Sequence, residues 1–126
     1  MEVEKIKQKI LDLDKKKKVK FITLFGSVAQ NKQNKLSDID IAVYYDGDKK
    51  ERFYFRIKAL GELPDKVDLQ IFQDLPLAVK KEVLSGKVIY SKDFVFTFDT
   101  YMGVIKDYNY FEKYITRFYE GEKGEI

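Results

Sequence analysis

The sequence predicts an α/β (α+β) domain over residues 1–126, in which helices flank a small β-sheet. Short apolar runs alternate along the chain with amphipathic stretches of helical period. Glycine, proline and aspartate fall at the junctions between them, where turns and helix caps need these residues. A length of 126 residues is also suited to one hydrophobic core. We expect the core to span residues 1–92 and a C-terminal helical segment to span residues 93–120.

The first third of the chain predicts two helices and two strands. Residues 21–25 are apolar and rich in β-formers, so they predict a buried strand. The turn that follows, Gly26-Ser27, leads into a short helix expected to start near Val28. Residues 39–43 alternate between apolar and polar, which predicts a strand with one face on the core. Apolar residues at three- and four-residue steps predict a first amphipathic helix: Val3, Ile6, Ile10 and Leu13.

The middle of the chain predicts a second helix and a third strand. Asp48 follows a turn and is expected to cap the helix, which Gly61 is expected to end. The apolar face of this helix is assigned to Phe53, Ile57 and Leu60. Residues 66–72 are a second short alternating run and predict the next strand.

A third helix and an edge strand complete the predicted core. Asp74 is expected to cap the helix, since Pro76 is tolerated in a first turn. Gly86 is expected to close it. Residues 88–90 form a short apolar segment, which predicts an edge strand.

Three aspartates and one turn are the candidate functional residues. Asp38 and Asp40 alternate with the isoleucines of their strand, so both carboxylates should emerge on the face away from the core. Asp68 alternates in the same way, and neighbouring strands would bring all three together. Close carboxylates repel one another, and a hard cation such as Mg²⁺ relieves the repulsion. Gly26-Ser27 lets a phosphate approach the backbone and offers a hydroxyl.

Composition excludes several kinds of chemistry. Cysteine and histidine are absent, which excludes disulfides, thiol catalysis, histidine bases and the usual zinc sites. A net charge of +3 is too small to predict direct nucleic-acid binding. The basic run 15–20 is interpreted as the solvated C-terminal end of the first helix, with a phosphate-attracting rim near the site as the alternative. No apolar run has membrane-spanning length and no signal peptide is visible, so a cytoplasmic protein is expected.

The spacing of these motifs resembles that of the DNA polymerase β nucleotidyltransferase superfamily, and in particular its minimal nucleotidyltransferases. Their pattern is Gly-Ser, an Asp-x-Asp eleven residues past the serine, and a separate strand aspartate. Here Asp38 lies eleven residues past Ser27, and Asp68 fits the third position. One departure is Gln30-Asn31, where many members carry Arg-Gly, so a phosphate contact of the arginine is absent. The resemblance covers residues 1–92 and implies the nucleotidyltransferase fold with its small mixed sheet.

The resemblance also implies a function. Minimal nucleotidyltransferases commonly pair with a helical HEPN protein, as antitoxin to a HEPN ribonuclease toxin. The implied reaction is transfer of AMP from ATP to a tyrosine hydroxyl of that partner. Gly26 and Ser27 would hold the triphosphate, Asp38 and Asp40 would bind two Mg²⁺ ions, and Asp68 would share a metal and accept the hydroxyl proton. A non-catalytic toxin-binding module and a transferase for a small molecule such as an aminoglycoside remain alternatives, and a homo-oligomer is left open.

The C-terminal segment predicts a partner-binding helix. Ten of the nineteen aromatic residues fall between positions 93 and 119, which is more than one buried helix stripe requires. Tyrosine and phenylalanine are typical of protein interfaces. We expect part of one face to be accessible in the isolated chain and covered by a helical partner, namely the face with Tyr101, Tyr108, Tyr114 and Phe118.

Overall fold

The fold was analysed in a computed structural model that describes residues 2–26 and 38–124. Four strands form one mixed sheet in the order β3-β2-β1-β4. β1 (Val19–Phe25) runs antiparallel to both β2 (Ile39–Tyr45) and β4 (Lys87–Ser91), and β2 runs parallel to β3 (Val67–Ile71). The predicted α/β class and the small mixed sheet are therefore confirmed.

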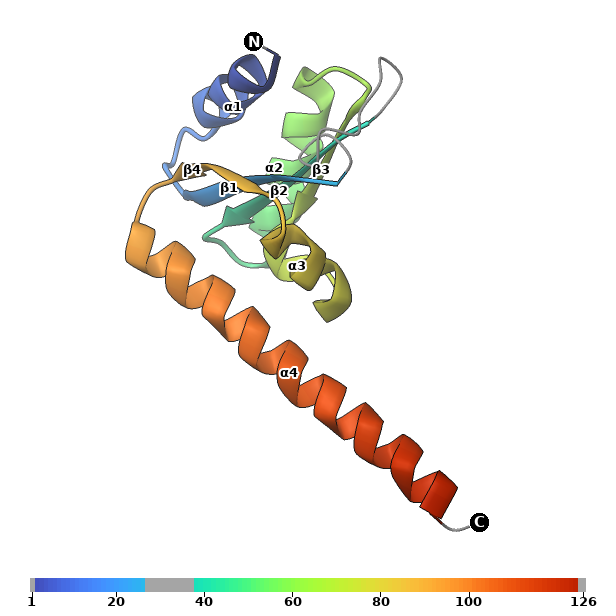
Figure 1. The fold of residues 1–126 in the computed structure, drawn as a ribbon. Coiled ribbons are helices and arrows are strands. Elements are labelled where there is room, and N and C mark those ends of the chain that lie inside the picture. The colour runs from blue at the N-terminus through green and yellow to red at the C-terminus, as the bar shows by residue number, and fades with distance from the viewer. Residues whose placement is uncertain (1, 27–37, 125–126) are drawn as a thin grey trace.

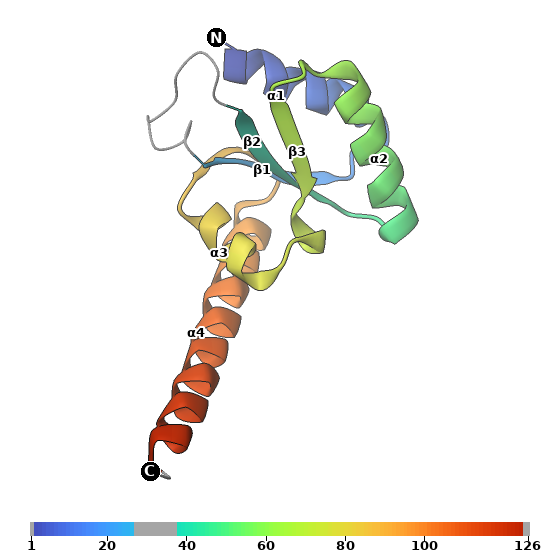
Figure 2. The ribbon, with the colours of Figure 1, turned by 90° about the vertical axis from the view of Figure 1, so that its right-hand side faces the viewer.

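Helices cover both faces of this sheet. α1 (Glu2–Leu13) and α2 (Lys49–Glu62) lie on one face, and α3 (Leu77–Leu84) and α4 (Phe94–Gly124) lie on the other (Figure 1). The 3-10 turn η1 (Phe72–Asp74) connects β3 to α3. Figure 2 shows the two helix pairs on opposite sides of β1, β2 and β3.

The two faces of the sheet have separate cores. The odd-numbered residues of β2 and β3 pack under α1 and α2, together with Ile6 and Ile10 of α1 and Phe55 and Ala59 of α2. The core under α3 and α4 is more aromatic and includes Phe21, Phe25, Phe72, Val83 and Val104. Because side chains alternate along a strand, the even-numbered residues of β2 and β3 belong to this second face.

The buried face of α2 differs from the one the sequence predicts. Phe53 and Ile57 are about half exposed, at 56% and 50%, whereas Phe55 and Ala59 are buried. Phe55 stacks on Tyr45 of β2, with ring centroids 4.5 Å apart. Leu60, the third residue of the predicted face, does pack against this core. The helix therefore contacts the sheet through Phe55 and Ala59 in place of Phe53 and Ile57.

Two helix boundaries also need correction. α2 continues through Gly61 to Glu62, with Leu63 in extended conformation after it. Asp74 does not cap α3, since Pro76 holds the N-cap position. The Asp74 carboxylate instead receives two hydrogen bonds from Arg52, at 3.2 and 2.7 Å. The predicted cap at Asp48 is confirmed, and Glu51 completes a capping box with it.

α4 is anchored at its N-terminal half and free at its C-terminal half. Thr97 and Val104 are buried, and the Tyr101 hydroxyl is hydrogen-bonded to Thr23 in the middle of β1. Beyond Tyr108 every residue through Gly121 is exposed. The helix projects away from the rest of the molecule in both ribbon views (Figures 1 and 2). Among the described residues, no helix is long and apolar enough to cross a membrane.

Candidate nucleotidyltransferase site

The candidate site lies where β1 ends and where β2 and β3 begin. Asp40 is the second residue of β2, and its partner on one side is Phe25, the last residue of β1. Its partner on the other side is Asp68, the second residue of β3. Asp40 and Asp68 are thus direct neighbours in parallel strands, with both side chains on the face of α3 and α4. The sequence predicted this shared face, and the strand pairing brings the two carboxylates together.

Asp38 and Ser27 are placed differently. Asp38 precedes β2 and is exposed. It lies close enough for its charge to act on Asp40. Ser27, the predicted helix start near Val28 and the departure at Gln30-Asn31 lie outside the described residues.

Gly26 closes the site on the side of β1. Its φ of +79° is in the left-handed region, which glycine adopts without strain. A Cβ built on Gly26 would lie 2.3 Å from Oδ2 of Asp40. Any larger residue would therefore push against the central carboxylate. The sequence predicted that glycine allows a ligand close to the backbone, and in the structure it also makes room for Asp40.

α3 brings a further carboxylate to the site. Its end approaches β1 so closely that a Cβ on Gly86 would lie 2.1 Å from the carbonyl oxygen of Leu24. One turn earlier on the helix, Glu82 acts electrostatically on Asp40. The sequence analysis missed Glu82, because nothing local indicates that this helix packs against the end of β1.

The electrostatics of the site centre on Asp40. Its pKa is raised above the ordinary value, first by burial and then by the negative charges of Asp68, Asp38 and Glu82. Mutual repulsion was the expected cause, and it contributes, but desolvation is the larger effect. A carboxylate that is costly to ionise among other carboxylates gains most from a cation.

Asp68 is held by a neighbour on its own strand. Nε2 of Gln70 donates a hydrogen bond of 3.0 Å to Oδ1 of Asp68. Both side chains are half-buried. The sequence analysis did not select Gln70, since a lone glutamine on a strand is usually a solvated residue.

The donor set fits Mg²⁺ that arrives with a nucleotide. Within residues 2–26 and 38–124, no three acidic side chains form a complete metal-ligand group. Mg²⁺ needs no such cage, because it keeps several waters and commonly takes one or two carboxylates plus substrate phosphates. Asp40 and Asp68 supply two adjacent carboxylates, and Asp38 is within electrostatic reach of Asp40.

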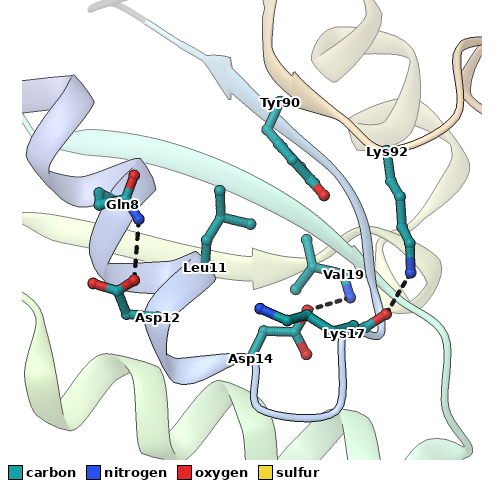
Figure 3. Close-up of a pocket in the computed structure, with 8 residues that line it drawn as sticks. All are labelled: Gln8, Leu11, Asp12, Asp14, Lys17, Val19, Tyr90 and Lys92. Carbon is teal, nitrogen blue, oxygen red and sulfur yellow. Dashed lines mark hydrogen bonds between the residues drawn. The ribbon is translucent and has the colours of Figure 1, made fainter.

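The lysine run lies at the other end of the sheet. Lys17 and Lys92 line a surface pocket of about 410 Å³ between α1, the start of β1 and the end of β4, shown in Figure 3. There Lys92 Nζ donates to the carbonyl of Lys17 at 2.7 Å, and Asp14 accepts from the backbone N–H of Val19 at 2.8 Å. Lys15 to Lys18 lie in the turn after α1 and Lys20 lies at the start of β1, whereas the aspartates lie where β1 ends. The alternative of a phosphate-attracting rim is therefore wrong. The interpretation as the end of the first helix is wrong too, since the last turn of α1 has no basic residue.

Comparison with known protein families shows to which family this chain belongs. The family described as polymerase beta, nucleotidyltransferase, matches residues 4–95. The chain belongs to this family. The match contains Gly26, Ser27 and all three aspartates, so the resemblance inferred from their spacing is confirmed.

Two relatives from Methanocaldococcus jannaschii are named as protein adenylyltransferases. MJ1547 is 39% identical over 77 residues, which cover 60% of this chain and 59% of that protein. MJ0435 is 33% identical over 90 residues, which cover 70% of this chain and 97% of that protein. The matched part thus spans less than two thirds of MJ1547 and nearly all of MJ0435.

Solved structures confirm the fold. A toxin–antitoxin complex with AMP-PNP contains a chain that matches with a TM-score of 0.69 and 24% identity, covering 90% of this chain and 95% of that chain. A complex of a tri-AMPylated Shewanella oneidensis HEPN toxin with an MNT antitoxin contains one that matches with a TM-score of 0.67 and 21% identity, covering 94% and 96%. At these identities the likeness concerns the fold alone.

Proposed function

We propose that this chain transfers AMP from ATP to a tyrosine hydroxyl of a HEPN-family protein, and so acts as the antitoxin of a toxin–antitoxin pair in the cytoplasm. The observation that carries the proposal is the pairing of Asp40 with Asp68 beside the left-handed Gly26. This places two carboxylates and an open backbone turn at one end of the sheet. Family membership and the names of the two M. jannaschii relatives support the reaction class.

The roles of the residues follow from their chemistry. Gly26 and Ser27 hold the triphosphate, because a turn without a Cβ lets phosphate oxygens reach backbone N–H groups. Asp38 and Asp40 would hold Mg²⁺, and Asp68 would contribute a further carboxylate. The metal, when bound, neutralises charge on the phosphates and lowers the barrier to displacement at phosphorus.

Asp68 is assigned as the base. The acceptor oxygen forms a bond to the α-phosphorus of ATP, the bond from that phosphorus to the bridging oxygen breaks, and pyrophosphate leaves. The hydroxyl proton passes to the Asp68 carboxylate. Histidine and cysteine are absent from the chain, so a carboxylate is the base best placed for this transfer.

α4 supplies the surface for the partner. Its projecting half exposes large apolar side chains at 51–74%, including Tyr110, Phe111, Tyr114 and Phe118. A groove of about 700 Å³ runs between this half and α3. Of the four residues expected on an accessible face, Tyr114 and Phe118 are exposed, while Tyr101 and Tyr108 are half-buried against the body. Exposed contiguous aromatics mark contact sites.

The test is transfer of label from ATP to a HEPN protein from the same genome, co-expressed with this chain. Incubation with α-labelled ATP and Mg²⁺ should label the partner, and Asp38→Asn combined with Asp40→Asn should abolish labelling while complex formation persists. Full labelling by the double variant would contradict the assigned roles. A wild-type chain that binds the HEPN protein and labels nothing would instead support a non-catalytic binding module.

A further inference from the structure

Gln70 lies at the site, and the proposed reaction gives it no role. Its side chain is half-buried on β3, two residues after Asp68 and on the same face of the sheet. The amide nitrogen lies 3.0 Å from Oδ1 of Asp68. An ionised carboxylate can only accept hydrogen bonds, so the amide must direct its nitrogen, not its oxygen, at Asp68.

We propose that Gln70 is a positioning residue that fixes the carboxylate of Asp68 for nucleotide transfer. The inference rests on the proposed function of the site and adds to it. With Oδ1 engaged by the amide, Oδ2 is the oxygen left to serve the metal and the acceptor hydroxyl. Hydrogen-bond partners that orient metal-binding carboxylates typically contribute 10- to 100-fold in metal affinity or activity.

The sheet provides room for this arrangement. Gln70 pairs with Ala42 in the parallel register, just as Asp68 pairs with Asp40. Ala42 is fully buried and carries only a methyl group. A larger residue there would compete for the space beside Gln70, whereas alanine lets the glutamine lean along its own strand toward Asp68.

A neutral donor suits a site that must receive a cation. Lysine or arginine at position 70 would pair with Asp68 and oppose the approach of Mg²⁺. An amide orients the carboxylate through a dipole and leaves its full negative charge available. Asp68 and Asp40 carry like charges on adjacent strands, so a donor that fixes the direction of the Asp68 carboxylate counters their repulsion.

Two substitutions separate donation from simple packing. Gln70→Leu removes the amide, and Gln70→Glu keeps the shape of the side chain but cannot donate when ionised. Both should lower kcat for AMP transfer to the co-expressed HEPN protein about tenfold or more, measured at saturating ATP and Mg²⁺. Gln70→Asn, which keeps the donor on a shorter chain, should recover part of the rate.

Metal binding gives a readout that does not depend on activity. Mn²⁺ can be titrated into the full chain with AMP-PNP present, and free Mn²⁺ followed by electron paramagnetic resonance. The Kd of Mn²⁺ should rise about tenfold in Gln70→Leu relative to wild type. If wild type binds Mn²⁺ but transfers no AMP, the proposed function fails while this titration still decides the role of Gln70.

Gln73→Leu is the matched control. The Gln73 amide is bonded to the backbone of Tyr45 at the far end of β2, so its loss should leave kcat and the Mn²⁺ Kd unchanged. Wild-type kcat and Mn²⁺ affinity in a folded Gln70→Glu or Gln70→Leu variant would overturn the proposal. A wild-type chain that binds no Mn²⁺ would overturn it too, since Asp68 would then serve no metal site.

Discussion

Asp40 shows how one residue can depend on several distant parts of the chain. The pleat of β2 directs its side chain away from the isoleucines, and Gly26 leaves the space that its Oδ2 occupies. Asp68 and Glu82 reach it from β3 and α3. The carboxylate is partly desolvated and surrounded by negative charges, so its ionised form destabilises the folded state.

Because the ionised form of Asp40 is unfavourable in the folded protein, Asp40→Asn should raise the free energy of unfolding in the absence of divalent cations. The size of this effect should depend on pH. The pKa of Asp40 in the folded protein is raised above its ordinary value of 3.8. Between these two pKa values the folded protein holds more protons than the unfolded protein, so the free energy of unfolding falls as the pH rises. Wild-type stability should fall across that window relative to the variant. Urea denaturation with EDTA should therefore show the variant more stable at pH 7 and equal to wild type below pH 3.8. A variant less stable than wild type at pH 7 would contradict the assigned cause.

Gly26→Ala tests the close approach beside Asp40. Alanine would be strained at a φ of +79° and would collide with the Asp40 carboxylate. We expect a loss of about 1–3 kcal/mol in the free energy of unfolding. Gly61→Ala is the control: it lies in α2 with open space around it and should gain about 0.5–1 kcal/mol. Equal stability changes in both variants would refute the steric argument.

Among the elements, α2 shows what local sequence can and cannot predict. The start of α2 is determined by neighbouring residues, and the capping box of Asp48 and Glu51 is visible in the sequence. The buried face of α2 is not visible there, because Phe53 and Phe55 are equally apolar and the choice between them depends on packing against Tyr45 and the rest of the core. For the same reason the sequence predicted Asp74 as the cap of α3, whereas its carboxylate forms an ion pair with Arg52 of α2.

The capping box gives a prediction for α2. Asp48→Ala removes the acceptor for the backbone N–H of Glu51, which lies 2.8 Å from Oδ1. The expected cost is about 1 kcal/mol in the free energy of unfolding, measured by chemical denaturation. An unchanged denaturation midpoint would mean that tertiary packing alone fixes the start of this helix.

α4 gives a prediction about binding. Tyr114→Ala combined with Phe118→Ala should weaken the complex with the HEPN protein by about 2 kcal/mol or more, measured by calorimetry. Thermal stability of the free chain should hardly change, because both side chains are exposed at 62% and 59%. Phe53→Ala combined with Tyr54→Ala is the control, since this equally exposed pair lies on α2 across the sheet. Equal loss in both double variants would disprove a specific role for α4.

At the scale of the whole molecule, two faces of one sheet carry different tasks. The face under α1 and α2 carries a mainly aliphatic core, while the face under α3 and α4 holds the aspartates at one end and the anchor of α4 along its length. The projecting helix leaves the same face as the site. A partner bound to α4 would thus be held on the side of the sheet from which Asp40 and Asp68 emerge.

Period-two alternation was enough to predict that Asp40 and Asp68 share a face. Their direct pairing depends on which strands become neighbours, and that is decided by packing between segments far apart in sequence. Glu82 was missed for this reason, because its place at the site depends on the packing of α3 against the end of β1. Gln70 is two residues from Asp68 on the same strand, and it was missed because a lone glutamine on a strand is usually a solvated residue. Site residues placed by the alternation of side chains along a strand could be predicted, and contacts that depend on tertiary packing could not.

The central claim is that this end of the sheet transfers AMP. The most direct measurement compares ATP labelled at the α-phosphate with ATP labelled at the γ-phosphate, using the co-expressed HEPN protein as acceptor. Transfer of AMP predicts that only the α-label joins the partner and that the γ-label is released as pyrophosphate. Incorporation of the γ-label, or of neither label by a complex that binds ATP and Mg²⁺, would contradict the account.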